Sequence, residues 1–505
     1  MFRKLLVANR GEIAVRIVRT CRDLDIPTVA VYSDADRDSL HVRYADEARR
    51  LGPAPSTESY LNMDALLEAA RETGADSVHP GYGFLAENAE FARRCQEAGL
   101  TFVGPPPDVV ALMGDKAAAR RVARAAGVPI VPGTEALSDD NEALREAKRI
   151  GFPLLVKAVS GGGGKGMRTV SSPSELEAAL RQARSEATSS FGDGSVYLER
   201  YLERPRHIEF QILADDKGSV IHLLERECSI QRRHQKLIEE CPSPRLDAGL
   251  RRRMGDAALA IAHASAYRNA GTVEFLLDQE GNYYFLEMNA RLQVEHPVTE
   301  MVLGLDLVEL QLQIAAGKPL SLSQDEIRPR GWAIEFRITA EDPYRDFLPC
   351  PGRIEFLRSA GGPGIREDSG VATGMEVSPH YDPLIAKLIV WGYDRASCLT
   401  RAERALREYR VVGIATTLPF FRRVLRDPQF RAGDIDVGYV ERSWKDSAAV
   451  AKAASPAIER DRVALIAAAL TAYQAETKSR KRLVPSGERS AWAQRGIKEQ
   501  HRSRF

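Results

Sequence analysis

The first 113 residues alternate short apolar runs with helical stretches, and this alternation constrains the fold more than any other feature of the sequence. Helical stretches lie at 12–24 and 62–73. Strands that alternate with helices indicate βαβ units and an open parallel sheet. The apolar runs are KLLVAN, TVAVYS, SVHPG and LTFVGP.

The rest of the chain indicates further structural units, because single hydrophobic cores stop growing at roughly 250 to 300 residues. Residues 131–203 hold FPLLVKAV and a glycine run, which predict a small α/β insert. Residues 205–345 are rich in strands and form the expected catalytic body. The composition changes after about residue 445. Further helices are expected at 173–188, 248–267, 299–316 and 395–409.

Charge and cysteine content exclude several classes of protein. With 71 basic and 70 acidic residues the chain has no long basic face, so no nucleic-acid partner is expected. The six cysteines form no CxxC pair, which is typical of a reduced, cytoplasmic protein. The opening MFRKLLVANRGEIAVRIV indicates a strand and a helix rather than a signal peptide. No stretch approaches the roughly 20 apolar residues that cross a bilayer, so no membrane association is expected.

A glycine run is the first candidate for ligand binding. In LLVKAVSGGGGKGMR, residues 154–168, backbone N–H groups of the glycines can close on phosphate oxygens, and Lys157 and Lys165 supply charge. The order of residues is neither a P-loop nor a dinucleotide fingerprint, and a flexible surface hairpin is the alternative. Lys116 lies in the first turn of its predicted helix, where the helix dipole disfavours a cation. A bound anion would explain that position, and a solvated lysine is the alternative.

Residues 271–289, GTVEFLLDQEGNYYFLEMN, predict a β-hairpin that turns at 279–282. If Asp278 pairs with Tyr283, then Glu274 lies opposite Glu287, and Asn289 shares the face of Glu287. Facing carboxylates repel unless a cation lies between them. Two carboxylates and an amide oxygen suit Mg²⁺ or Mn²⁺ held together with nucleotide phosphates. The alternative is a solvated sheet face.

If the extended conformation continues, Arg291, Gln293 and Glu295 prolong this polar face. A guanidinium binds a small carboxylate-like anion, and a nearby carboxylate can take a proton from it, which fits bicarbonate. In WAIEFRITA, Arg337 leaves the apolar face and could join the same cleft. Its alternative is a structural salt bridge to Glu335 or Glu341.

Five long motifs resemble those of biotin carboxylases: ECSIQRRHQKLIEE (227–240), EMNARLQVEHPVTEM (287–301), HPGYGFLAEN (79–88), MGDK (113–116) and KAVSGGGGKGM (157–167). The resemblance covers roughly residues 1–445 and implies an α/β protein with the ATP-grasp fold. The implied parts are an N-terminal Rossmann-like domain at 1–113, an ATP-grasp domain at 114–330 with a small α/β lid at about 131–203, and a C-terminal α+β domain at 331–445.

The resemblance also implies a role for individual residues. The implied ATP contacts are Lys116, Lys157, Gly161, Gly162, Gly163, Gly164, Glu199, Leu202, His207, Gln231 and His234. The implied metal ligands are Glu274, Glu287 and Asn289, which agrees with the hairpin argument. Bicarbonate would meet Lys236, Arg291, Gln293 and the Val294 backbone, with Glu295 as general base. Biotin would meet Tyr82 and Arg337, and the catalytic group comprises Lys236, Arg291, Glu295 and Arg337.

The implied reaction is MgATP- and bicarbonate-dependent carboxylation of biotin through carboxyphosphate. The departures from the family pattern, Arg200 and Cys241, remove no group that this chemistry needs. Another ATP-grasp ligase, which joins a carboxylate to an amine, is the second hypothesis, and a nucleotide sensor without catalysis is the third. The final acceptor of the carboxyl group, an acyl-CoA such as acetyl-CoA or propionyl-CoA, or pyruvate, stays open. The family also implies a homodimer whose partners are a biotin carboxyl carrier protein and a carboxyltransferase.

The methionines predict how biotin reaches this chain. Carrier domains of this family offer their lysine in a Met-Lys-Met context, and none of the eight methionines here is followed by lysine. We therefore expect the purified chain to carry no covalent biotin and to need a carrier in trans. A streptavidin-reactive band at the mass of this chain would contradict this prediction.

The tail from residue 446 lies beyond all these motifs. SPAIERDRVALIAAALTAY (455–473) predicts a capped helix, and 478–505 hold nine Lys/Arg and two Glu around Trp492. A basic tail of this kind is either disordered or a docking segment for the carrier or the carboxyltransferase. If the segment docks, truncation after Lys445 leaves carboxylation of free biotin nearly intact and weakens co-purification with the partner subunits. Equal assembly of the truncated and full chains would support the disordered alternative.

Overall fold

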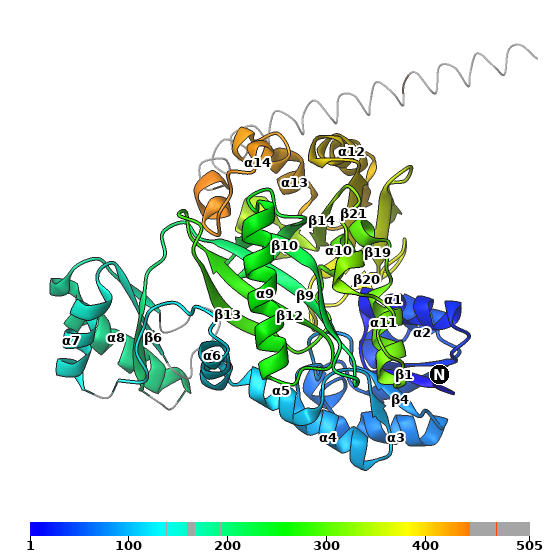
Figure 1. Cartoon of the computed structure of the whole chain (residues 1–505). Helices are drawn as coiled ribbons and strands as arrows, with labels where there is room; N and C mark the ends of the chain where they lie inside the picture. The colour runs from blue at the N-terminus through cyan, green and yellow to red at the C-terminus, as the bar shows by residue number, and fades with distance from the viewer. Residues whose placement is uncertain (138, 159–166, 192–193, 445–470, 472–505) are drawn as a thin grey trace, which may run out of the picture. The chain divides into compact units, whose positions relative to one another are not determined.

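The N-terminal part of the chain is a parallel sheet covered by helices, as the alternating pattern predicted (Figure 1). The computed structural model describes residues 1–137, 139–158, 167–191, 194–444 and 471. Five strands pair in parallel in the order β3-β2-β1-β4-β5. The strands are β1 (Leu5–Val7), β2 (Thr28–Ser33), β3 (Glu47–Gly52), β4 (Ser77–His79) and β5 (Thr101–Phe102). The helices are α1 (Gly11–Asp23), α2 (Leu40–Tyr44), α3 (Met63–Thr73) and α4 (Ala89–Glu97).

Two helices, α5 (Pro107–Gly114) and α6 (Lys116–Ala125), lead into the predicted α/β insert. The side chain of Asp115 caps α6 by accepting the N–H groups of Ala117 and Ala118, which places Lys116 in the first turn as predicted. The insert has a three-stranded antiparallel sheet, ordered β7-β6-β8, with an apolar core of its own. Its elements are α7 (Asp140–Ile150), β6 (Leu154–Ala158), β7 (Arg168–Val170), α8 (Pro173–Phe191) and β8 (Val196–Arg200).

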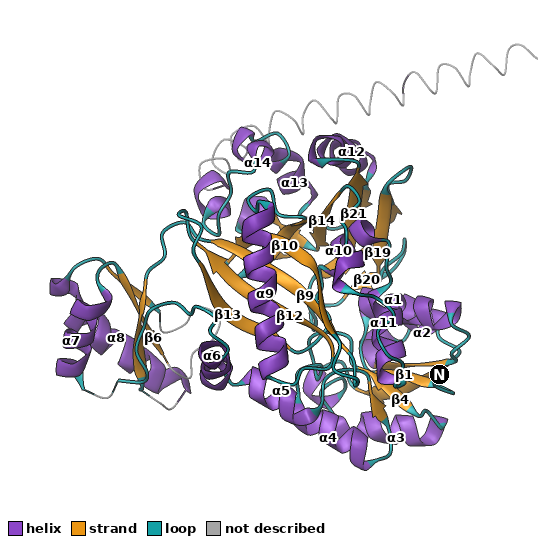
Figure 2. Cartoon of the chain, viewed as in Figure 1, coloured by secondary structure: helices purple, strands orange, loops and turns teal. Residues whose placement is uncertain are grey.

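The predicted catalytic body is built on an eight-stranded antiparallel sheet ordered β13-β12-β9-β10-β11-β14-β21-β19. Helix α9 (Ala248–Ala264) covers one face, and Met254 and Ile261 pack there with Phe275 (Figure 2). Strands β11 and β14 pair. The implied ATP-grasp segment (114–330) and the implied C-terminal segment (331–445) therefore share this sheet. The strands are β9 (Arg206–Ala214), β10 (Val220–Arg232), β11 (Gln235–Cys241), β12 (Asn269–Leu277), β13 (Tyr283–Asn289), β14 (Trp332–Thr339), β19 (Ile365–Ser369) and β21 (Leu384–Gly392).

The helix expected at 299–316 is two helices, α10 (His296–Leu303) and α11 (Leu307–Ala315). Gly304 ends α10 with a left-handed φ of 70°, a conformation that glycine adopts without a side-chain clash. Asp306 then caps α11 by accepting the N–H of Glu309. The Gly-Leu-Asp sequence at 304–306 therefore ends one helix and starts the next, although the apolar pattern continues through it.

The C-terminal part adds short strands and further helices, and residues 1–443 form one compact unit. Within the described residues, no helix is long and apolar enough to cross a membrane. The helix expected at 455–473 lies outside the described residues except for Thr471. The elements are β15 (Glu341–Asp342), β16 (Leu348–Pro349), β17 (Gly352–Arg353), β18 (Phe356–Arg358), β20 (Glu376–Val377), α12 (Arg395–Glu408), β22 (Arg410–Val412), α13 (Leu418–Val424) and α14 (Pro428–Ala432).

Candidate active site

The hairpin of β12 and β13 brings Glu274 directly opposite Glu287, as predicted. The predicted pairing at the turn is wrong by one residue, because Leu277 rather than Asp278 pairs with Tyr283. A β-bulge restores the facing pair: the register shifts between Glu274 and Phe275, and β13 has one extra residue there. The bulge therefore turns both carboxylates toward the same face.

Glu274, Glu287 and Asn289 fit a divalent cation. Burial and the facing Glu274 raise the pKa of Glu287, although Lys116 opposes them, with Nζ 3.7 Å from Glu287 Oε2. The Nδ2 atom of Asn289 is buried without a hydrogen-bond partner among the described residues. Two facing carboxylates and a nearby amide form the oxygen donor set that Mg²⁺ and Mn²⁺ prefer.

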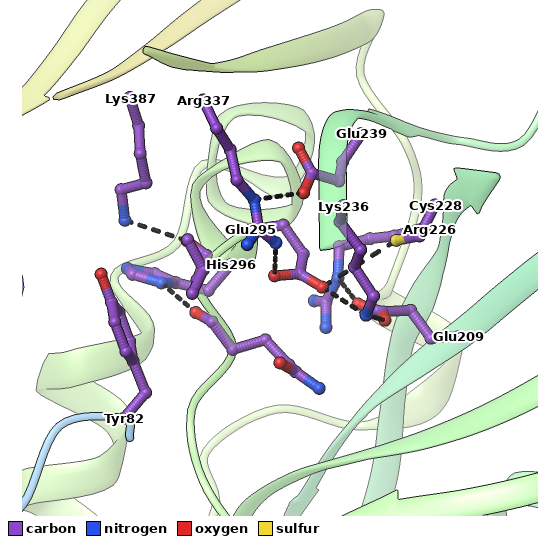
Figure 3. A network of polar contacts seen from close by, with 12 residues as sticks. Tyr82, Glu209, Arg226, Cys228, Lys236, Glu239, Glu295, His296, Arg337 and Lys387 are labelled. Carbon is purple, nitrogen blue, oxygen red and sulfur yellow. Dashed lines mark hydrogen bonds and ion pairs between the residues drawn. The ribbon is translucent and has the colours of Figure 1, made fainter. Parts of the chain in front are cut away.

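The ammonium of Lys236 lies among three carboxylates. Figure 3 shows it beside Glu209 and Glu295. Its Nζ atom donates to Glu209 Oε2 at 2.5 Å, to Glu274 Oε1 at 3.0 Å and to Glu295 Oε1 at 2.7 Å. Burial alone would lower the pKa of Lys236, but the three carboxylates raise it well above its usual value. The lysine is therefore charged, and it joins β11, β9, β12 and the turn before α10.

Glu295 is the fully buried carboxylate between Lys236 and Arg337. Burial would raise its pKa, but these two cations hold the pKa of Glu295 well below the usual value. The extended conformation expected through this residue is wrong, because β13 ends at Asn289 and Glu295 lies in the turn that leads into α10. Leu292 still turns into the apolar core, opposite to the polar side chains.

Arg291 and Gln293 join this network on the hairpin side. The guanidinium of Arg291 donates to Gln293 Oε1 at 2.7 Å and to Asn289 Oδ1 at 2.9 Å. Gln293 Nε2 donates to Glu274 Oε1 at 3.1 Å. A third arginine contact, to Glu87 Oε2 at 2.7 Å, ties the segment to the loop before α4. The structure therefore connects the predicted anion-binding residues to the carboxylate hairpin.

Arg337 on β14 joins two carboxylates from different segments. Its Nε atom donates to Glu239 Oε1 at 2.6 Å and its second guanidinium nitrogen to Glu295 Oε2 at 2.8 Å. Burial would lower the pKa of Arg337, but both carboxylates raise it. These partners are neither Glu335 nor Glu341, the alternatives considered from the sequence.

The residues expected near the nucleotide fall into smaller groups. Lys157 forms an ion pair with Glu199, which Arg120 also contacts at 2.8 Å. His207 Nε2 lies 3.0 Å from Glu274 Oε2, and Glu274 raises the pKa of His207 against the effect of burial. The remaining positions differ in exposure: Gln231 is buried, Leu202 is half-buried and His234 is exposed. Gly161, Gly162, Gly163, Gly164 and Lys165 lie outside the described residues.

The sequence argument missed several charged residues of this network. Glu209 and Arg226 are both fully buried and form an ion pair with each other. Glu239 binds Arg337, and burial raises the pKa of Glu239 to about 7 against the effect of that arginine. A signal existed for Glu209, because in RHIEFQILAD it alternates with apolar residues on the same strand.

Comparison with protein families accounts for most of the described chain. The family model "Biotin carboxylase, N-terminal domain" matches residues 1–110. The model "Carbamoyl-phosphate synthase L chain, ATP binding domain" matches residues 115–323, and "Biotin carboxylase C-terminal domain" matches residues 335–442. Together they bear out the ATP-grasp fold expected from the motifs.

Individual relatives agree with these matches. The chain is 53% identical over 443 residues to a pyruvate carboxylase subunit of Methanothermobacter thermautotrophicus, covering 87% of this chain and 90% of the relative. It is 53% identical over 441 residues to a biotin carboxylase of Nostoc sp., covering 87% and 99%. The biotin carboxylase domain dimer of Hydrogenobacter thermophilus 2-oxoglutarate carboxylase, solved with MgADP, ADP and bicarbonate, superposes with a TM-score of 0.82 at 48% identity, covering 88% and 98%. The chain therefore belongs to the biotin carboxylase family of ATP-dependent ligases.

Proposed function

We propose that this chain uses MgATP and bicarbonate to carboxylate biotin on a separate carrier protein, with the Lys236 network as its active site. The observation that carries this proposal is the contact of Glu295 with both Lys236 and Arg337. Glu295 is ionised, as a general base must be, and bicarbonate that takes over the contact with Lys236 would raise the pKa of Glu295 and make it a better proton acceptor. The solved 2-oxoglutarate carboxylase domain, which contains bicarbonate and MgADP, supports this choice of ligands.

On the bicarbonate side, we assign the anion to Lys236, Arg291, Gln293 and the backbone of Val294. Each of the three side chains presents N–H donors and contacts another residue of the network. Bicarbonate would displace some of these internal contacts, since a guanidinium fork matches a planar carboxylate-like anion. Glu295 is then placed to take its proton.

On the nucleotide side, we assign the ATP phosphates to Lys116, Lys157 and Gly161, Gly162, Gly163 and Gly164. We assign the adenine to Glu199 and Leu202, and the surroundings of the ribose and phosphates to His207, Gln231 and His234. Glu274, Glu287 and Asn289 would hold Mg²⁺ or Mn²⁺, which neutralises phosphate charge when bound. Lys116 supports this division, because its ammonium lies 3.7 Å from Glu287 Oε2, beside the proposed metal ligands.

The proposed reaction assigns proton transfer and charge stabilisation to the protein. Glu295 takes the bicarbonate proton, and the anion attacks the γ-phosphorus of ATP, giving ADP and carboxyphosphate. Carboxyphosphate breaks down to CO₂ and phosphate, and the phosphate removes the proton from N1′ of biotin. The guanidinium of Arg337 stabilises the resulting enolate, and N1′ attacks CO₂. Tyr82 is assigned to the biotin side of the site.

Bicarbonate-dependent ATP cleavage, measured with and without free biotin, tests this proposal. We expect ADP formation to require bicarbonate and carboxybiotin to form when biotin is added. ATP cleavage that depends on a carboxylate and an amine substrate would instead support another ATP-grasp ligase. ATP binding without turnover would support a nucleotide sensor.

For the final acceptor, we propose an acyl-CoA, acetyl-CoA or propionyl-CoA, with pyruvate as the alternative. Relatives with similar identity include both a biotin carboxylase and a pyruvate carboxylase subunit, so pyruvate has direct support. Reconstitution with the carrier and carboxyltransferase subunits, followed by assays with each acceptor, separates the two.

The proposed assembly is a homodimer that works with two partners, the carrier protein and the carboxyltransferase. The 2-oxoglutarate carboxylase domain was solved as a dimer, which supports the first part. We propose that the chain divides into domains at 1–113, 114–330 and 331–445, with the lid at about 131–203. A cytoplasmic location is proposed from the six cysteines, all of which are free.

A further inference from the structure

Lys387 on β21 is a charged residue buried completely beside the proposed site. Its exposed fraction is 0%, and a lysine is almost never buried to this degree unless it is paired. In the sheet register it lies opposite Arg337 on one neighbouring strand and opposite Asp368 on the other. Strand alternation therefore places it on the face of the sheet that carries Arg337.

The ammonium of Lys387 joins two segments that are far apart in the sequence. Its Nζ atom donates to the backbone oxygen of Val294 at 2.9 Å and lies 3.1 Å from Glu12 Oε2. Asp368 Oδ2 is farther away, at 4.0 Å. Figure 3 shows Lys387 pointing toward the segment that carries Glu295 and His296. Through Glu12 the lysine links this turn before α10 to the first turn of α1.

The chain of contacts continues to the biotin side. The hydroxyl of Tyr82 donates to Glu12 Oε1, the second oxygen of the carboxylate that faces Lys387. The ring of Tyr82 also faces the ammonium, with Nζ 5.9 Å from the ring centroid. Tyr82 and Val294, assigned above to biotin and to bicarbonate, are therefore connected through two buried side chains.

Stability alone is a weak reason for this arrangement. A buried ion pair is often no more stabilising than apolar residues of similar volume, because both charges lose their hydration. The carbonyl that Lys387 holds lies between Gln293 and Glu295, whose side chains bind Glu274, Lys236 and Arg337. Fixing that peptide therefore fixes two side chains of the site.

We propose that Lys387 is a positioning residue for bicarbonate: its ammonium holds the Val294 carbonyl so that Gln293 and Glu295 keep their places, while Glu12 couples this anchor to Tyr82. The inference rests on the proposed function, because it acts through residues assigned there to bicarbonate. Lys387 itself does not touch the reacting atoms.

The test compares three variants of the full chain: Lys387→Met, Glu12→Gln and the double variant. The first removes the carbonyl anchor and leaves Glu12 without its cation. The second keeps the anchor, and the double variant removes the anchor without leaving an unpaired buried charge. Each is assayed for the KM of bicarbonate and of ATP in bicarbonate-dependent ATP cleavage, and for its unfolding temperature.

We expect Lys387→Met and the double variant to raise the KM for bicarbonate by roughly tenfold or more, the usual effect of losing a hydrogen bond to a charged group. The KM for ATP should stay unchanged, and Glu12→Gln should raise the KM for bicarbonate less than Lys387→Met does, because it keeps the contact of the lysine with the Val294 carbonyl. The double variant should unfold at a higher temperature than Lys387→Met. A crystal structure of the double variant should show the Val294 carbonyl displaced.

Three results would overturn the inference. A wild-type KM for bicarbonate in the double variant would mean that Lys387 only balances the charge of Glu12. A parallel rise of both KM values would mean a structural role. Wild-type protein that cleaves ATP without requiring bicarbonate would overturn the proposed function as well, whereas the first two results leave that function standing.

Discussion

Replacement of Glu287 with glutamine is expected to reduce ATP cleavage and biotin carboxylation together, each by roughly a hundredfold to a thousandfold. The proposed cation site has two carboxylates, and Glu274 already binds Lys236, His207 and Gln293. Glu287 is the less engaged of the two, with Lys116 at 3.7 Å. Its loss removes half of the carboxylate charge at the proposed cation site. ATP cleavage and the carboxylation of biotin that depends on it should therefore both decline.

The stability of this variant should move in the opposite direction. Like charges that face each other across two strands destabilise a sheet, and burial with Glu274 already raises the pKa of Glu287. The metal-free variant should therefore unfold at the same temperature as the wild type or higher. Glu280→Gln, an exposed position in the same hairpin, is the matched control and should retain full activity. Normal ATP cleavage by Glu287→Gln would contradict the assigned metal site.

The parts of this site that could be predicted from the sequence depend on local patterns. The alternation of apolar runs and helices predicted the parallel sheet. The assumed hairpin register placed Glu274 opposite Glu287, a pair that the structure contains although its register at the turn differs by one residue. The bulge in β13 was not predictable, because an extra residue changes no periodicity until the two strands are paired. Gly304 indicates the end of a helix, but the continuous apolar pattern outweighed this indication in the prediction of a single helix at 299–316.

The ion pairs of the site could not be derived from sequence spacing, because each one joins segments far apart in the chain. Arg337 illustrates the difficulty: its nearest acidic neighbours in the sequence are not its partners, and the sheet order selects Glu239 instead. Lys387 carries no motif, and its role becomes visible only where its contact with Val294 is known. Periodicity predicts which face a side chain occupies, whereas partner choice depends on the tertiary arrangement.

Replacement of Arg337 with alanine is expected to reduce carboxylation of biotin by roughly a hundredfold or more while bicarbonate-dependent ATP cleavage falls less. The guanidinium is assigned to the biotin enolate, which forms only after carboxyphosphate has been made. Lys236 remains next to Glu295, at 2.7 Å, and continues to hold that carboxylate for the first step. The variant should therefore show ATP cleavage that is no longer coupled to carboxybiotin.

The alanine variant also leaves Glu239 without the cation that it binds at 2.6 Å. Removing one partner of a buried ion pair costs about 3 to 5 kcal/mol, because the remaining charge stays buried. Burial already raises the pKa of Glu239 to about 7, so this carboxyl can relieve the cost by taking a proton. A lower unfolding temperature of Arg337→Ala would therefore not by itself reveal a catalytic role.

The double variant Arg337→Ala/Glu239→Gln separates the two effects. It removes the unpaired carboxylate, so its unfolding temperature should lie closer to that of the wild type, while the defect in carboxylation should persist because the enolate still lacks its guanidinium. The two activities are measured in one assay, as ADP and carboxybiotin formed at saturating bicarbonate. Equal and parallel losses of both activities in Arg337→Ala, or recovery of carboxylation in the double variant, would show that Arg337 supports Glu239 and Glu295 rather than the biotin enolate.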